Sequence, residues 1–210
     1  NSLMTGLRPQ TIGVYDLPTN FRAAAPQAIT LSQHFIQQGY FAQGLGKIFH
    51  TGHGNFDDQA SWSVPSWRPK ASTYALPESL RNTQTDSKGK KRGPATEAAA
   101  VADESYADGL VAQEAIARLR SASQTPEQPF FLAVGFIRPH LPFVAPQGYW
   151  DLYDPKLFPL PTVLSAPLDA PSYAPTSGGE LRTYAGIPQS VDADTTRHLI
   201  HGYYAATSYT

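Results

Sequence analysis

Residues 129–136 read Pro-Phe-Phe-Leu-Ala-Val-Gly-Phe, and residues 138–143 read Arg-Pro-His-Leu-Pro-Phe. Eight residues in a row without a polar side chain predict a strand that is buried on both faces. Such strands belong to parallel sheets that carry helices on both sides. This stretch therefore predicts an α/β fold with a mostly parallel central sheet and helices on both faces.

A helix is predicted directly before this strand. Apolar residues recur at helical spacing along residues 107–122, namely Ala112, Ala115, Ile116 and Leu119. Residues 194–209 predict a further helix. A helix followed by a buried strand is the repeating unit of α/β proteins.

A second helix–strand unit is predicted nearer the beginning of the chain. Thr30 and Gln33 form a capping-box pattern, in which each side chain can satisfy a backbone N–H group of the other residue. Gly39 can end the helix in a left-handed conformation. We therefore expect a helix at about 31–38 and a short strand at 40–45.

Bulk composition excludes several classes of protein. The 210 residues are 41% hydrophobic and 16% charged, which suits one α/β domain or a large part of one. A net charge of −1 offers no broad basic surface, so no nucleic-acid partner is expected. No apolar run approaches the roughly 18 residues that cross a bilayer, so no membrane span is expected. The chain has no cysteine, so it contains neither disulfides nor thiolate metal sites.

Proline is abundant, with 19 residues, and predicts long loops. These loops fall mainly in residues 61–97 and 139–190. Aromatic residues in them favour ordered, packed loops over disorder. The residues concerned are Trp62, Trp67, Tyr74, Tyr149, Trp150 and Tyr153.

Polar residues follow both predicted strands. Lys47 and His50 come directly after the strand at 40–45, and His140 comes after the strand at 129–136. Open α/β sheets bind ligands at the carboxyl ends of their strands. A lysine and two histidines at such an edge suit an active site that handles an anion and moves protons. Taken alone, Lys47 would be interpreted as a solvated surface lysine, which is the default for this residue type.

Three segments resemble motifs of a known family. Residues 1–9 read Asn-Ser-Leu-Met-Thr-Gly-Leu-Arg-Pro, residues 46–50 read Gly-Lys-Ile-Phe-His, and residues 139–143 read Pro-His-Leu-Pro-Phe. The first resembles the second half of the type I sulfatase signature, whose first half is Cys-x-Pro-Ser-Arg. The other two resemble the Gly-Lys-x-x-His and Pro-His-x-Pro-Phe motifs of the iduronate-2-sulfatase-like branch. The chain is thus similar, nearly from end to end, to formylglycine-dependent sulfatases.

This resemblance implies a fold and a set of cofactors. It implies the alkaline-phosphatase-like α/β fold, with residues 1–210 as part of the N-terminal catalytic domain. The nucleophile would be a formylglycine made from a cysteine or serine upstream of Asn1 by a formylglycine-generating enzyme. The Ca²⁺ ligands would also lie outside this chain. The substrate would be a sulfated carbohydrate containing uronate units, and the location would be periplasmic, secreted or lysosome-like.

The resemblance also implies roles for individual residues. Lys47 would contact sulfate and formylglycine, His50 would accept a proton from the nucleophile, and His140 would hydrogen-bond the sulfate and the leaving oxygen. Asp58 lies in the loop where similar enzymes shape their sugar pocket and is expected to bind substrate. The alternative for Asp57 and Asp58 is a solvated turn.

The sequence is also compatible with other functions. Choline-sulfate hydrolysis and phosphonate or phosphate monoester hydrolysis belong to the same superfamily. A non-catalytic homologue could bind sulfated glycans without cleaving them. A zinc hydrolase could use His50, His53 and His140. A zinc site on His198 and His201, which repeat a His-x-x-His spacing, is not expected, because no third ligand follows from the spacing.

Overall fold

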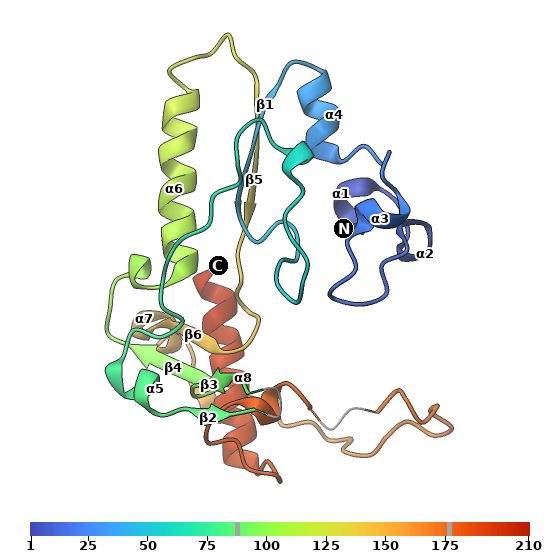
Figure 1. Cartoon of the computed structure of the whole chain (residues 1–210). Helices are drawn as coiled ribbons and strands as arrows, with labels where there is room; N and C mark the ends of the chain where they lie inside the picture. The colour runs from blue at the N-terminus through green and yellow to red at the C-terminus, as the bar shows by residue number, and fades with distance from the viewer. Residues whose placement is uncertain (87–88, 176–177) are drawn as a thin grey trace. The chain divides into compact units, whose positions relative to one another are not determined.

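The computed structural model describes residues 1–86, 89–175 and 178–210. The chain forms two compact units, each assembled from two segments (Figure 1). Unit 1 comprises Asn1–Lys70 and Ala107–Ile137, and unit 2 comprises Ala71–Tyr106 and Arg138–Thr210. Each unit has a buried core of its own.

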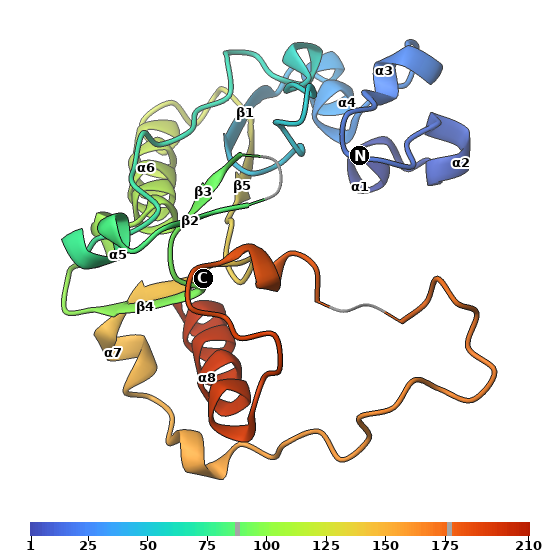
Figure 2. The same cartoon turned by 60° about the horizontal axis from the view of Figure 1, so that its bottom comes forward.

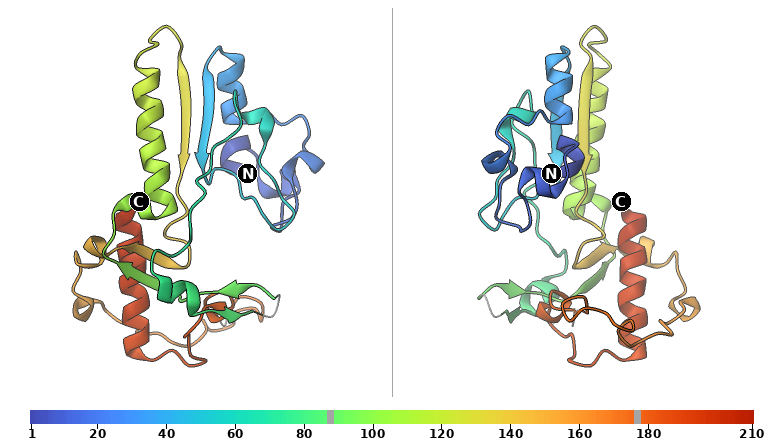
Figure 3. Two further views of the ribbon diagram at one scale, coloured as in Figure 1. Left: turned by 60° about the vertical axis from the view of Figure 1, so that its left-hand side comes forward. Right: turned by 90° about the vertical axis from the view of Figure 1, so that its right-hand side faces the viewer.

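Unit 1 is built around two parallel strands, β1 (Phe41–Gly46) and β5 (Phe130–Gly135). The helices α4 (Leu31–Gln37) and α6 (Ala107–Ala122) flank this pair (Figure 3). Neighbouring residues of β5 point to opposite faces of the pair. Phe131 stacks on Phe35 of α4 at 4.7 Å between ring centroids, whereas Leu132 packs into the cluster of Val111 on α6. Parallel strands with a helix on each face confirm the α/β prediction at this point.

The boundaries of these elements follow the local signals of the sequence. Both halves of the capping box are present, with Thr30 accepting from the Gln33 N–H and the Gln33 side chain accepting from the Thr30 N–H. Gly39 has φ 84°, as a left-handed helix end requires. The helix predicted at 107–122 is observed over those residues.

Short elements that the sequence analysis did not predict complete the core of unit 1. They are α1 (Ser2–Thr5), α2 (Pro9–Ile12), α3 (Phe21–Ala24) and the 3₁₀ turn η1 (Gln59–Ser61). Their buried side chains join those of the loop after β1 in one cluster, formed by Met4, Ile12, Phe21, Phe49 and Trp62. These helices are too short to show a periodic apolar pattern, so pattern analysis could not find them.

The prediction that residues 129–136 are buried on both faces is wrong. Phe130 is 42% exposed and Val134 is 36% exposed. Among the described strands, β5 pairs with β1 alone, so its other edge has no neighbouring strand. An edge strand covered by a single helix on this face leaves the side chains at its ends partly in solvent.

Unit 2 contains a second parallel pair, β4 (Thr96–Ala99) with β6 (Phe143–Pro146). The helices α7 (Gln147–Trp150) and α8 (Ala193–Tyr209) pack beside these strands (Figure 2). Gly202 permits this packing, because a Cβ there would lie 2.9 Å from the Trp150 ring and 3.1 Å from Phe143. The helix predicted at 194–209 is confirmed as α8.

The remaining elements of unit 2 are short. They are α5 (Pro77–Arg81), β2 (Gln84–Thr85), β3 (Lys91–Arg92), η2 (Asp103–Ser105), η3 (Pro155–Leu157) and η4 (Leu181–Thr183). β2 and β3 pair antiparallel. The described residues therefore form three two-stranded sheets and not the single central sheet that we predicted. The expectation of packed aromatic residues in the long loops is confirmed where Trp62, Tyr74 and Trp150 are buried.

Candidate functional site

Lys47 directly follows β1 and is half-buried. Its backbone N–H donates to the carbonyl oxygen of Gly135 at 2.7 Å. This approach requires glycine on both strands. A Cβ on Gly46 would lie 2.1 Å from the Gly135 oxygen, and a Cβ on Gly135 would lie 2.2 Å from the Lys47 oxygen. The two glycines therefore place Lys47 at the carboxyl end of the strand pair, where the sequence predicted it.

His50 lies three residues further on, on a segment anchored in the core. Phe49 is only 2% exposed and contacts the rings of Phe21 and Trp62 at 5.9 and 6.1 Å between centroids. The Arg68 side chain also donates to the Phe49 carbonyl oxygen at 3.2 Å. Buried Phe49 thus fixes the short segment that carries both Lys47 and the half-buried His50.

His53 lies beside His50, although the sequence suggested a role for it only as a zinc ligand. Its ring stacks against His50 with 6.0 Å between centroids and 24° between planes. Its φ of 53° is left-handed, which is uncommon for a residue other than glycine. The turn is closed by two backbone hydrogen bonds between Gly52 and Asn55. A Gly-His-Gly sequence is the signal that could have indicated this turn.

Asp58 is buried, at 7% exposure, so the solvated-turn alternative is wrong for this residue. Arg22 donates to both carboxylate oxygens at 2.9 and 2.8 Å, and the Ser61 hydroxyl donates to one of them. Burial acts to raise the pKa of Asp58, but the hydrogen bonds from Arg22 and Ser61 and the charge of Arg22 outweigh it and lower the pKa. The expected substrate ligand is thus already engaged in an internal ion pair.

Asp57 points to different partners. Its carboxylate accepts hydrogen bonds from the Trp62 indole N–H at 3.2 Å and from the Ser66 hydroxyl. Trp62 in turn packs against Phe49. Both aspartates of this loop therefore tie the chain around the Lys47–His50 segment to the core of unit 1.

His140 belongs to unit 2, because the chain passes from one unit to the other between Ile137 and Arg138. The side chain is exposed, and the peptide bonds before Pro139 and Pro142 are cis. The Leu141 carbonyl accepts from Nδ1 at 2.8 Å, and Nε2 lies 3.7 Å from the Glu180 carboxylate. Nδ1 is thus held by the backbone, and Nε2 faces the Glu180 carboxylate.

The two histidines of α8 are held by neighbouring residues of unit 2. His201 donates through Nε2 to the Trp150 carbonyl oxygen at 2.7 Å, and His198 Nε2 lies 2.9 Å from the Thr96 hydroxyl. Burial and the nearby His201 lower the pKa of His198. Within residues 1–86, 89–175 and 178–210, no group of three histidine, aspartate or glutamate side chains could hold a metal ion. In the same residues, no helix is long and apolar enough to span a membrane.

The chain aligns with curated sulfatases over almost its whole length. Iduronate 2-sulfatase of Mus musculus is 30% identical over 223 residues, which are 99% of this chain and 39% of the relative. Over this span the chain is similar to a sulfatase. A sulfatase of Formosa agariphila is 27% identical over the whole of this chain. Choline-sulfatase of Rhizobium meliloti is 28% identical over 80% of this chain.

This chain spans 39%, 42% and 33% of the lengths of these three relatives. A comparison with models of protein families finds no match. The resemblance seen in three short motifs thus extends along almost the whole of this chain.

Proposed function

We propose that this chain is part of an enzyme that hydrolyses sulfate esters, in an alkaline-phosphatase-like domain. The observation that carries the proposal is the anchored Lys47–His50 segment at a strand end, in a chain that aligns with sulfatases over 99% of its length. A sulfate ester is an anion, and its cleavage needs stabilisation of negative charge and transfer of protons. Lysine and histidine at one strand end provide both.

The roles we propose follow from residue type and position. Lys47 binds the sulfate group, His50 accepts a proton, and His140 contacts the sulfate and leaving oxygens through Nε2. Asp58 acts as a positioning residue, because Arg22 and Ser61 occupy its carboxylate.

Calcium and formylglycine, which the family resemblance implies, find no place among these residues. The chain has no Cys-x-Pro-Ser-Arg sequence and no version of it that begins with serine, and its described part brings no three metal-ligating side chains together. We therefore assign none of the described residues to either group. We propose that both are supplied by residues outside these 210, after maturation by a formylglycine-generating enzyme.

For the substrate we propose a sulfated, uronate-containing polysaccharide, met in a periplasmic, secreted or lysosome-like location. The match to a relative named iduronate 2-sulfatase supports this choice. Choline-sulfate is the second candidate, because a relative named choline-sulfatase also aligns with 80% of the chain. A homologue that binds sulfated glycan without cleaving it is the non-enzymatic alternative.

The decisive assay measures sulfate release by the protein that carries this chain, coexpressed with a formylglycine-generating enzyme. A small aryl sulfate, 2-O-sulfated uronate disaccharides and choline sulfate are compared as substrates. Lys47→Ala and His140→Ala should each reduce kcat/KM by 100-fold or more, on the order of the loss expected for a charged or proton-transferring group. The matched controls Lys70→Ala and His34→Ala should retain activity. Full activity in the Lys47 and His140 variants would refute the assigned roles, and glycan binding without sulfate release would favour the non-enzymatic alternative.

A further inference from the structure

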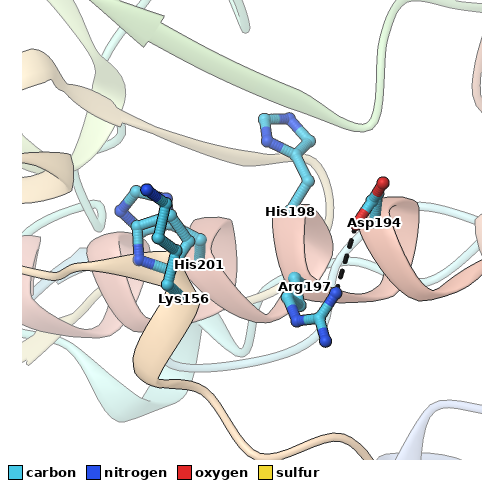
Figure 4. Close-up of a pocket in the computed structure, with 6 residues that line it drawn as sticks. Lys156, Asp194, Arg197, His198 and His201 are labelled. Carbon is cyan, nitrogen blue, oxygen red and sulfur yellow. Dashed lines mark hydrogen bonds and ion pairs between the residues drawn. The ribbon is translucent and has the colours of Figure 1, made fainter.

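A cavity of about 420 Å³ lies in unit 2, between η3 and the first turns of α8 (Figure 4). Its lining residues come from these two elements and are Pro155, Lys156, Asp194, Arg197, His198 and His201. A second hollow of about 360 Å³ shares Asp194 and His198 with the first. Cavities of a few hundred Å³ are the size that binds small organic ligands.

The lining of this cavity carries an excess of positive charge. Lys156 is exposed, and its ammonium group makes no ion pair with any carboxylate of the described residues. Arg197 pairs with Asp194 at 3.1 Å, but the Asp194 side chain is 95% exposed. Exposed pairs of this kind contribute under about 1 kcal/mol, so the guanidinium can readily turn to another anion.

The two imidazoles of the cavity are fixed in place, in contrast to the two long cations. Trp150 is buried, and its ring lies 5.5 Å from that of His198 and 4.8 Å from that of His201. The Trp150 carbonyl holds His201, and the Thr96 hydroxyl holds His198. The cavity thus combines two hydrogen-bonded imidazoles with two cationic side chains.

We propose that this cavity binds a tetrahedral oxyanion, namely sulfate or the sulfate group of a sulfated sugar, between Lys156 and Arg197. The arginine fork and the lysine ammonium supply donors for the oxygens of such a group. The Asp194 carboxylate can accept a hydrogen bond from a sugar hydroxyl, and the adjoining hollow has room for a sugar ring. The choice of sulfate among oxyanions rests on the proposed function. The presence of a cationic cavity is observed independently of that function.

The six histidines of the chain provide a site-resolved test. Imidazole resonances are recorded by NMR on the 210-residue chain at pH 7.5 during titration with sodium sulfate, glucose 6-sulfate or, as a neutral control, glucose. Signals of His198 and His201 should shift with saturation for both sulfates and not for glucose. Signals of His50, His53 and His140 report the proposed active site in the same spectra, so failure there and failure here are distinguishable. Tighter binding of glucose 6-sulfate would identify the sugar sulfate as ligand, and equal binding would identify sulfate itself.

Variants separate specific binding from general charge effects. Lys156→Ala and Arg197→Ala should each weaken binding about fivefold or more, as loss of one charged contact predicts. Arg81→Ala and Lys90→Ala remove exposed cations elsewhere in the same unit and should leave the affinity unchanged. Asp194→Asn should tighten binding by about threefold, because it releases Arg197, and an unfolded variant could not produce this gain. Unshifted His198 and His201 signals, or equal losses in the control variants, would overturn the proposal.

Discussion

Gly46 and Gly135 face each other at the carboxyl end of the β1–β5 pair, so closely that a Cβ on Gly46 would lie 2.1 Å from the Gly135 carbonyl oxygen. The same approach allows the Lys47 N–H to reach that oxygen. The position of the proposed sulfate-binding lysine therefore depends on two residues without side chains.

Gly46→Ala should destabilise unit 1 by about 3 kcal/mol or more, because it adds a backbone clash to left-handed strain. Gly39→Ala is the matched control. Gly39 is also left-handed, with φ 84°, but a Cβ there meets nothing within 4 Å. Its cost should stay near 1 kcal/mol. Urea unfolding of both variants measures the difference, and equal losses would show that the close approach is not formed in solution.

The Arg22–Asp58 pair should make stability depend on pH. The pKa of Asp58 is lowered in the folded state, so its contribution is present above the ordinary carboxyl pKa of about 3.9 and is lost as the pH falls through the folded value. The free energy of unfolding in urea should therefore fall more steeply below pH 4 for the native protein than for the Asp58→Asn variant. Parallel curves would contradict the assigned ion pair.

Removal of Arg22 should cost more than removal of an exposed cation. Arg22→Ala leaves a buried carboxylate without its charged partner, and we expect a loss of about 2–4 kcal/mol at pH 7. Asp58→Asn in the same background should restore part of this loss, because the amide is neutral. A double-mutant cycle measures the coupling, and additive effects would refute it.

In unit 2, Tyr106 should stabilise buried Glu97. The Tyr106 hydroxyl donates to the Glu97 carboxylate at 2.7 Å, beside the backbone N–H groups of Ala75 and Leu76. Burial and this hydrogen bond raise the pKa of Tyr106, so the phenol remains a donor at neutral pH. Tyr106→Phe should cost about 1–3 kcal/mol, as expected for a hydrogen bond to a buried charge. Tyr149→Phe removes a more exposed hydroxyl that contacts Asp103 and should cost less in the same thermal unfolding assay.

His53 should be replaceable by residues that tolerate a left-handed backbone. His53 has φ 53°, a left-handed value that glycine adopts without strain and that β-branched residues tolerate poorly. His53→Gly should therefore raise the stability by up to about 1 kcal/mol, whereas His53→Val should lower it by about 1 kcal/mol or more. Chemical denaturation of the two variants tests this order. Equal stability of the glycine and valine variants would mean that the turn between Gly52 and Asn55 is not formed.

Elements with strong local signals were predictable. The capping box at Thr30 and the apolar spacing in 107–122 each depend on residues within a few positions of one another, and both helices are observed where expected. The burial of β5 was not predictable in the same way. An apolar run shows that a strand can be buried, but its exposure depends on which strands pair with it.

In the candidate site, too, local features were predictable from the sequence and contacts between distant segments were not. The sequence by itself determined the sulfatase motifs and the position of Lys47 and His50 after a strand, because a strand and the residues that follow it are local features. Only the tertiary structure decided that Asp58 pairs with Arg22, 36 positions away, and that Lys156 of η3 lines one cavity with Arg197 of α8. Such contacts form when distant segments are buried together, and burial depends on the packing of the whole unit rather than on the spacing of residues along the chain.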